Sequence, residues 1–117
     1  RSKVNKDVLM KFEDLLDVYF QSEQSPNEKL PTVKYFADKV NLSSNYFGDL
    51  IKKETGKTAQ EYIQGKIINI AKERILASEK TVSEIAYELG FQYPQHFTRI
   101  FKKVVGCTPT EYRVIQV

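Results

Sequence analysis

The sequence predicts an all-α protein with seven helices. Apolar residues recur at every third or fourth position in most segments, which is the spacing of one helix face. No segment keeps the alternation of polar and apolar residues that a half-buried strand requires. Capping residues and glycines also stand where the apolar segments begin and end, as they do at helix termini.

The first helix is expected over residues 5–22, where the apolar side chains share one face: Val8, Leu9, Phe12, Leu15, Leu16, Tyr19 and Phe20. Residues 23–31 read EQSPNEKLP, and two prolines among polar neighbours predict a loop. Thr32 is a suitable N-cap for a short helix that ends at Asn41. A further helix is expected from about Ser44 to Thr55, because Gly56 stops it.

A phrase of twelve residues occurs twice, as IKKETGKTAQEY at 51–62 and FKKVVGCTPTEY at 101–112. Gly56 and Gly106 stand where a helix C-terminus favours a left-handed residue. Thr58 and Thr108 each precede a glutamate by three positions, which is the spacing of a capping box. Each copy therefore ends one helix on a lysine pair and starts another, in which Tyr62 and Tyr112 are expected to be core residues.

The linking helix is expected over residues 58–78, followed by another capping box, Thr81 with Glu84. Residues 81–106 then repeat the pattern of residues 32–56, and the terminal helix is expected over 108–115. Pro109 suits its first position, where the missing N–H costs nothing.

The two halves also align before the repeated phrase, at an offset of 49: Val33 with Val82, Ala37 with Ala86, Val40 with Leu89, and Leu42 with Phe91. Each half is a short helix, a tight turn and a second helix. A small residue midway along the first helix lets the second cross it closely. This pattern is typical of a helix-turn-helix unit, so we expect two such subdomains joined by the linking helix. Two helical hairpins packed as a plain bundle are the alternative.

Charge favours a DNA-binding function for the second copy. Residues 94–106 contain Arg99, Lys102 and Lys103 and no acidic residue. Near the start of this helix, Gln95, His96 and Arg99 can hydrogen-bond base edges, and the lysines farther along can meet phosphates. A helix that enters the major groove needs this order of residues.

The first copy is less basic. Residues 43–56 contain Lys52 and Lys53 but also Asp49 and Glu54, so their charges sum to zero. Asp49 would be repelled by phosphates unless it accepts a hydrogen bond from a cytosine amino group. A linking helix of about 20 residues would span ~30 Å. The two reading helices could then enter successive major grooves, which recur every ~34 Å, at unlike half-sites.

Composition argues against several other classes of protein. The chain has 117 residues, a net charge of +3 and a single cysteine, Cys107, so an internal disulfide is excluded. The one histidine, His96, has no partner at metal-ligand spacing, and no catalytic constellation is present, so we expect no metal, no cofactor and no enzyme. No apolar run is long enough for a membrane span, and a cytoplasmic location is expected. The start at Arg1 suggests a piece of a longer protein.

Residues 90–113, GFQYPQHFTRIFKKVVGCTPTEYR, closely resemble the signature of the AraC/XylS family of bacterial transcription regulators. The resemblance extends back to residue 30, and residues 1–117 would form one DNA-binding domain. The family implies reading positions at Asn45, Tyr46 and Asp49 in the first unit, and at Pro94, Gln95, His96 and Arg99 in the second. In the family a serine–arginine pair is common where Gly48-Asp49 stands, and an arginine where Ile67 stands.

The resemblance also implies an activator that contacts RNA polymerase and responds to a small-molecule effector through a separate domain. The full set of predicted DNA-binding residues is Ser44, Asn45, Tyr46, Asp49, Lys52, Lys53, Gln92, Tyr93, Pro94, Gln95, His96, Arg99, Lys102 and Lys103. The competing hypothesis is a helical protein-interaction module derived from a DNA-binding domain, for which Asp49 and the modest net charge are the support.

Overall fold

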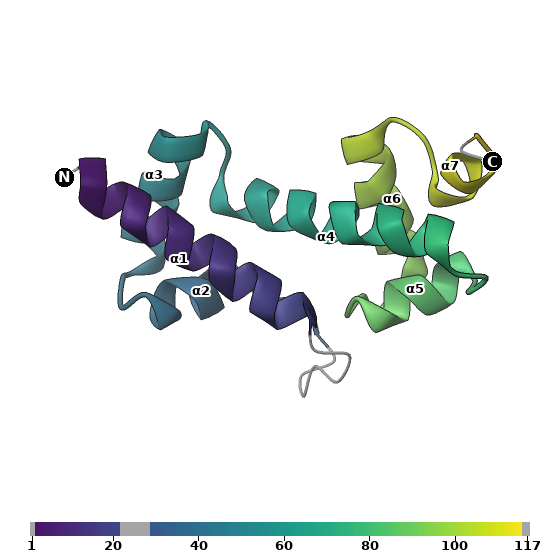
Figure 1. The fold of residues 1–117 in the computed structure, drawn as a ribbon, viewed down its shortest axis with the longest axis horizontal. Coiled ribbons are helices and arrows are strands. Elements are labelled where there is room, and N and C mark those ends of the chain that lie inside the picture. Colours follow the sequence, from purple (N-terminus) through teal and green to yellow (C-terminus); the bar gives the residue numbers. More distant parts are fainter. Residues whose placement is uncertain (1, 22–28, 116–117) are drawn as a thin grey trace. The chain divides into compact units, whose positions relative to one another are not determined.

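The computed structural model describes residues 2–21 and 29–115, and within these ranges it contains seven helices and no strand (Figure 1). The helices are α1 (Ser2–Gln21), α2 (Val33–Lys39), α3 (Ser44–Thr55), α4 (Ala59–Ala77), α5 (Val82–Glu88), α6 (Pro94–Val105) and α7 (Pro109–Ile115). The all-α prediction is confirmed. The first helix begins three residues earlier than expected, and the residue predicted to end it, residue 22, lies outside the described part, as does most of the predicted loop.

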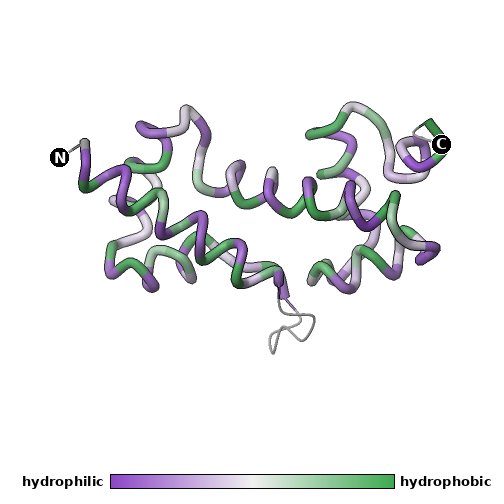
Figure 2. The backbone as a smooth tube through the Cα atoms, in the orientation of Figure 1, coloured by the Kyte–Doolittle hydropathy of each residue, from purple (hydrophilic) through white to green (hydrophobic). Residues whose placement is uncertain are grey.

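The described residues fall into two compact units. Unit 1 contains α1, α2, α3 and the first turn of α4 up to Ile63, and unit 2 contains Lys29, Leu30 and the chain from Gln64 onward. The linking helix α4 therefore contributes residues to both units. Along the helices, hydrophobic and hydrophilic residues interleave, as expected for helices with one face in a core (Figure 2).

The helix ends follow the capping signals in the sequence. The Thr32 hydroxyl accepts a hydrogen bond from the Tyr35 amide at 3.0 Å and caps α2. Gly56 and Gly106 adopt left-handed conformations, with φ of 78° and 101°, and end α3 and α6. The three predicted capping boxes are all formed, before α4, α5 and α7. Each box satisfies amide donors that the first helical turn leaves without an intrahelical partner.

The core of unit 1 is built around Phe12 of α1. Its ring meets those of Phe36 and Phe47 edge to face, with centroids 5.1 and 5.0 Å apart, and all three side chains are completely buried. Ala37 is also fully buried, as expected for the small residue at a helix crossing. The helices of the first helix-turn-helix are therefore held against a third helix, α1.

The core of unit 2 is also aromatic, but its three phenylalanines come from the turn and from α6. Phe91, Phe97 and Phe101 form a row of neighbouring rings, and Ala86 is buried at the crossing of α5 and α6. The prediction that these phenylalanines are core residues is confirmed. Ile67, at the position where the family often has an arginine, is also buried, with 3% of its surface exposed.

Tyr62 and Tyr112 are only half-buried, so their assignment to the core was too strong. The Tyr62 hydroxyl donates a hydrogen bond to Glu13, while its ring packs on Phe12. Burial, this hydrogen bond and the negative charges of Glu13 and Asp17 raise the pKa of Tyr62 to about 12. The apolar ring of Tyr62 thus packs in the core while its hydroxyl is satisfied by the exposed carboxylate of Glu13.

Candidate nucleic-acid interface

The turns of the two helix-turn-helix units have the same backbone hydrogen bond. The amide of Leu42 donates to the carbonyl of Ala37 at 2.9 Å, and the amide of Phe91 donates to the carbonyl of Ala86 at 3.0 Å. Each pair of residues matches the other at the offset of 49 seen in the sequence. The repeat is therefore a repeat of backbone geometry.

Both turns also contain a residue in the left-handed region. In unit 1 this residue is Asn41, with φ of 61°, and in unit 2 it is Gly90, with φ of 103°. Asparagine tolerates this conformation better than most side chains do. Gly90 has a second constraint, because a Cβ there would lie 2.8 Å from the carbonyl carbon of Lys29 and 3.0 Å from the amide nitrogen of Leu30. Only glycine therefore fits the second turn without displacing the backbone beside it.

The candidate reading helix of unit 1, α3, presents a polar face to solvent. Ser43 caps it, since its hydroxyl accepts a hydrogen bond from the Tyr46 amide at 3.1 Å. Phe47, Leu50 and Ile51 hold the opposite face in the core. The predicted contact residues are all exposed: Ser44, Asn45, Tyr46, Asp49, Lys52 and Lys53. The structure thus brings the six predicted residues of this unit onto one accessible helix.

The candidate reading helix of unit 2, α6, is held by Phe97, Ile100 and Phe101 and carries its cations outward. The exposed members of the predicted set are Gln92, Tyr93, Gln95, Arg99, Lys102 and Lys103. Neither Arg99 nor Lys103 forms an ion pair with any described residue. Both cations are therefore available to an anionic partner.

Two predicted residues of α6 are less accessible than expected. Pro94 is half-buried at the first helical position. His96 is half-buried as well, and its ring lies edge to face with Phe91, with centroids 5.4 Å apart. The sequence suggested a fully exposed histidine, but the turn packs Phe91 beneath it. A ring nitrogen of His96 can still hydrogen-bond a base, although one part of the ring packs against Phe91.

Position 49 of α3 corresponds to position 99 of α6 at the offset of 50, so the two units present opposite charges at matched sites. Asp49 is exposed and forms no ion pair with a described residue. An arginine at such a site can donate two hydrogen bonds to guanine, whereas an aspartate can accept one from the amino group of cytosine. The two faces are therefore suited to different bases.

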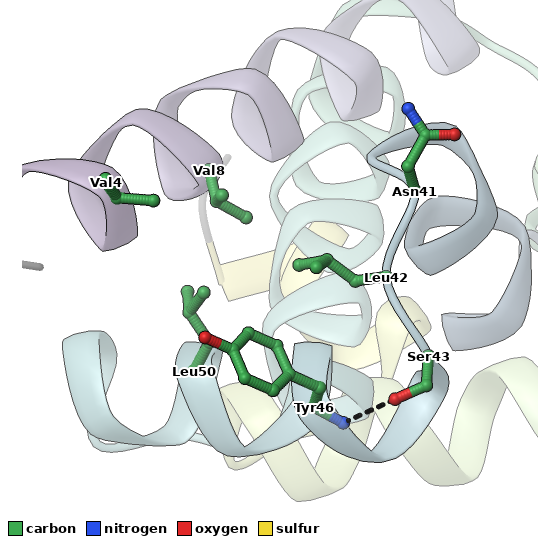
Figure 3. A pocket seen from close by; sticks show the side chains of 7 residues that line it. All are labelled: Val4, Val8, Asn41, Leu42, Ser43, Tyr46 and Leu50. Atoms are coloured by element: carbon green, nitrogen blue, oxygen red, sulfur yellow. Dashed lines mark hydrogen bonds between the residues drawn. The ribbon is translucent and has the colours of Figure 1, made fainter.

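One part of the surface was missed in the sequence. Val4 and Asn5, in the first turns of α1, line a hollow of about 330 Å³ together with Tyr46, Asp49, Leu50 and Lys53. A second hollow, of about 310 Å³, adjoins it at Val4, Tyr46 and Leu50 (Figure 3). The predicted first helix started at residue 5, and none of its residues was predicted to bind DNA. No local pattern in residues 2–5 would have indicated its position beside α3.

The described residues give no support to a metal site or a membrane span. Among residues 2–21 and 29–115, no cluster of three His, Cys, Asp or Glu side chains could hold a metal ion. None of the helices in these ranges combines the length and the hydrophobicity that a bilayer crossing needs. Cys107 is a free, half-buried thiol in the turn before α7.

Comparison with known proteins agrees with this geometry. A family profile described as a helix-turn-helix domain matches residues 36–114. The uncharacterized transcriptional regulatory protein YesN of Bacillus subtilis (strain 168) is 36% identical over 78 residues, which cover 65% of this chain and 21% of that protein. The transcriptional activator RhaS of Escherichia coli O9:H4 (strain HS) is 31% identical over 77 residues, covering 66% of this chain and 28% of RhaS.

Solved structures include the C-terminal domain of the two-component response regulator yesN from Fusobacterium nucleatum. It superposes with a TM-score of 0.78 at 28% identity, covering 92% of this chain and 98% of that domain. This chain therefore corresponds to one whole domain of that structure, but to about a fifth of the Bacillus subtilis relative. With its two helix-turn-helix units and these matches, the chain belongs to the AraC-type helix-turn-helix family, as its second repeat had indicated.

Proposed function

We propose that this chain binds double-stranded DNA in a sequence-specific manner and so regulates transcription. The observation that carries the proposal is the exposed face of α6. Over residues 94–106 this helix has three cations and no acidic residue, and Gln95 and Arg99 precede the lysine pair. The polar residues at the start suit base edges, and the cations that follow suit the phosphates that border the groove.

In this proposal α3 and α6 are the two reading helices, each in its own major groove. The lysine pair at the C-terminal end of each reading helix contacts phosphates, since the same pair occurs in both units. These residues are Lys52 and Lys53 in α3 and Lys102 and Lys103 in α6. Asn45, Tyr46 and Asp49 read one half-site, and Gln95, His96 and Arg99 read the other. Gln92 and Tyr93 in the turn, with Ser44 and Pro94 at the helix starts, lie close enough to the groove to touch the backbone.

The longer protein would act in the cytoplasm as an activator. Support comes from RhaS, a named activator, and from the bacterial relatives, of which this chain matches only a part. An activator at a promoter would contact RNA polymerase, and a small-molecule effector would act through a domain outside this chain.

The direct test is binding to DNA at several salt concentrations. Random duplexes are first selected on the chain, and the affinity for the selected and for a scrambled duplex is then measured between 50 and 200 mM salt. A DNA-reading domain should bind the selected sequence ~10³-fold or more tightly than the scrambled one. It should also lose affinity with a log–log slope of about −0.9 for each phosphate that it neutralises. A flat salt dependence with no sequence preference would contradict the proposal.

Asp49 supports a second candidate, in which unit 1 binds a protein instead of DNA. Its carboxylate lies on the exposed face of α3, where the charges of residues 43–56 sum to zero. If unit 1 serves a protein partner, substitutions in α6 should abolish DNA binding while Asn45→Ala and Lys52→Ala leave it unchanged. If both units read DNA, each of these α3 variants should weaken binding.

A further inference from the structure

We propose that the first turns of α1 form a third DNA-contacting element, beside the reading helix of unit 1. This inference rests on the proposed function, because it assumes that α3 enters a major groove. Val4 and Asn5 would contact the sugar–phosphate backbone of the strand that passes along the side of α3. No residue of α1 belongs to the helix-turn-helix itself, so this contact would extend the interface beyond the two repeated units.

The geometry places α1 next to the residues that we assign to DNA. Three of the six residues that line the hollow of about 330 Å³ are exposed residues of α3: Tyr46, Asp49 and Lys53. Val4 and Asn5 are the two lining residues from α1, and Leu50 is the buried member of the lining. Figure 3 shows the adjoining hollow, where Val4 and Val8 of α1 lie across from Tyr46 and Leu50 of α3. The hollow is thus continuous with the proposed reading face.

The size of a helix explains why DNA backbone would reach this hollow. An α-helix with its side chains is about 10–12 Å across, and the major groove is about 12 Å wide. A helix in the groove therefore fills it, and the strands on either side must run along the flanks of the helix. One flank of α3 is the hollow shared with α1, so the strand on that side would run past Val4 and Asn5.

The chemistry of the walls matches a sugar–phosphate chain. Val4 and Tyr46 are exposed apolar or aromatic side chains, with 61% and 59% of their surfaces accessible, and both can pack against deoxyribose. Lys53 and the Asn5 amide can both donate hydrogen bonds to a phosphate. Asp49, on the same wall, would be repelled by a phosphate, so we place the phosphate at the Asn5 and Lys53 side.

Charge gives an independent reason to expect this contact. The charges of residues 43–56 sum to zero, so α3 alone attracts DNA only weakly. In the first turns of α1, Lys3 and Lys6 are exposed and outnumber the one exposed acidic residue, Asp7. The start of α1 would therefore supply the positive potential that the reading helix of unit 1 lacks.

The test uses two sites on α1 with equal exposure. Val4 and Met10 are each 61% accessible, but only Val4 lines the hollows. Val4→Lys and Met10→Lys add the same charge to the same helix. If the inference is correct, Val4→Lys adds about one phosphate contact and steepens the log–log salt slope by about 0.9. Between 50 and 200 mM salt it should then lose about 3.5-fold more affinity than the wild-type chain, whereas Met10→Lys should follow the wild type.

Substitution by glutamate at the same two positions gives a second test, so the result does not rest on one pair of variants. Val4→Glu should weaken binding to the selected duplex, and Met10→Glu should change it far less. Thermal unfolding followed by circular dichroism checks that all four variants keep the wild-type fold. Equal effects of the Val4 and Met10 substitutions, with a wild-type chain that binds the duplex, would overturn this inference alone. If the wild-type chain does not bind DNA, the proposed function fails as well.

Discussion

Arg99 and Lys102 lie one turn apart on the exposed face of α6, yet we expect them to have different roles. Arg99 is near the start of the helix, where a guanidinium can donate two hydrogen bonds to a guanine. Lys102 is near the end, where an ammonium would meet a phosphate. A point charge on a phosphate carries no sequence information, whereas a paired contact to a base edge does.

Arg99→Ala should therefore cost about 1–3 kcal/mol on the selected duplex and relax the preference at one base pair. Lys102→Ala should weaken binding to all duplexes alike and reduce the salt slope by about one contact. Affinities of both variants for the selected duplex, its single-base variants and a random duplex separate these effects. Equal losses on selected and random duplexes for Arg99→Ala would contradict its assigned role.

Gly90 is constrained by a close backbone contact that the other left-handed glycines, Gly56 and Gly106, do not have. A Cβ at Gly106 would meet nothing within 4 Å, so Gly106→Ala introduces only backbone strain, about 1–2 kcal/mol. Gly90→Ala adds the same strain and a close approach to the backbone of Lys29 and Leu30, which should cost about 1–3 kcal/mol more. Urea unfolding of the two variants measures the difference. Equal losses in the free energy of unfolding would show that the backbone near Lys29 can move aside.

At the scale of the helix, the capping boxes couple stability to pH. The hydrogen bonds from the Thr108 amide and hydroxyl lower the pKa of Glu111, and those from Thr81 do the same for Glu84. A carboxyl whose pKa is lower in the folded chain stabilises the fold above its unfolded pKa. That contribution is lost as the pH falls through the folded pKa.

We therefore expect the carboxyls of Glu84 and Glu111 to titrate below the ordinary pKa of a glutamate. Thr108→Ala removes the hydroxyl but keeps the backbone amide, which is the larger cause, so it should raise the pKa of Glu111 only part of the way towards its ordinary value. The pKa of Glu84 should stay unchanged, since its carboxylate is held by Thr81. Titration followed by NMR gives both values in one experiment. An unchanged titration of Glu111 in the variant would mean that the backbone amide alone lowers its pKa.

Most helix ends could be predicted because each is set by a local rule. Thr32, Thr81 and Thr108 cap helices, and Gly56 and Gly106 end them, through contacts within four residues. The start of α1 was placed three residues too late, since its first turn contains no acidic residue that would mark it. The left-handed conformation of Asn41 was also not foreseen, because the break after Val40 could be read without it.

The candidate site could likewise be predicted only in part. A helical period placed the predicted contact residues of α3 and α6 outside the core, because the buried phenylalanines fix the orientation of each helix. The position of Val4 beside Tyr46 depends on the packing of α1 against α3, which brings together residues 42 positions apart in the chain, and the period of one helix does not determine that. The half-burial of His96 has the same cause, since it depends on the turn that brings Phe91 under the ring.

At the scale of the whole molecule, two unlike units should require two half-sites at a fixed spacing. Insertion of five base pairs between the half-sites of a selected duplex rotates one by about half a helical turn relative to the other. We expect this insertion to weaken binding by at least tenfold, and an insertion of ten base pairs to weaken it less. Electrophoretic mobility shifts on the three duplexes test this expectation. Equal affinity for all three would indicate that a single unit accounts for binding.

The difference between Asp49 and Arg99 has a consequence for any promoter to which such a chain binds. A symmetric dimer on a palindrome looks the same from upstream and downstream, but a monomer with dissimilar faces gives its complex a polarity. Under the proposed function, turning the operator around would point the same surfaces of the protein away from the start of the gene instead of toward it. Regulation would then depend on the orientation of the operator as well as on its distance from the start of the gene.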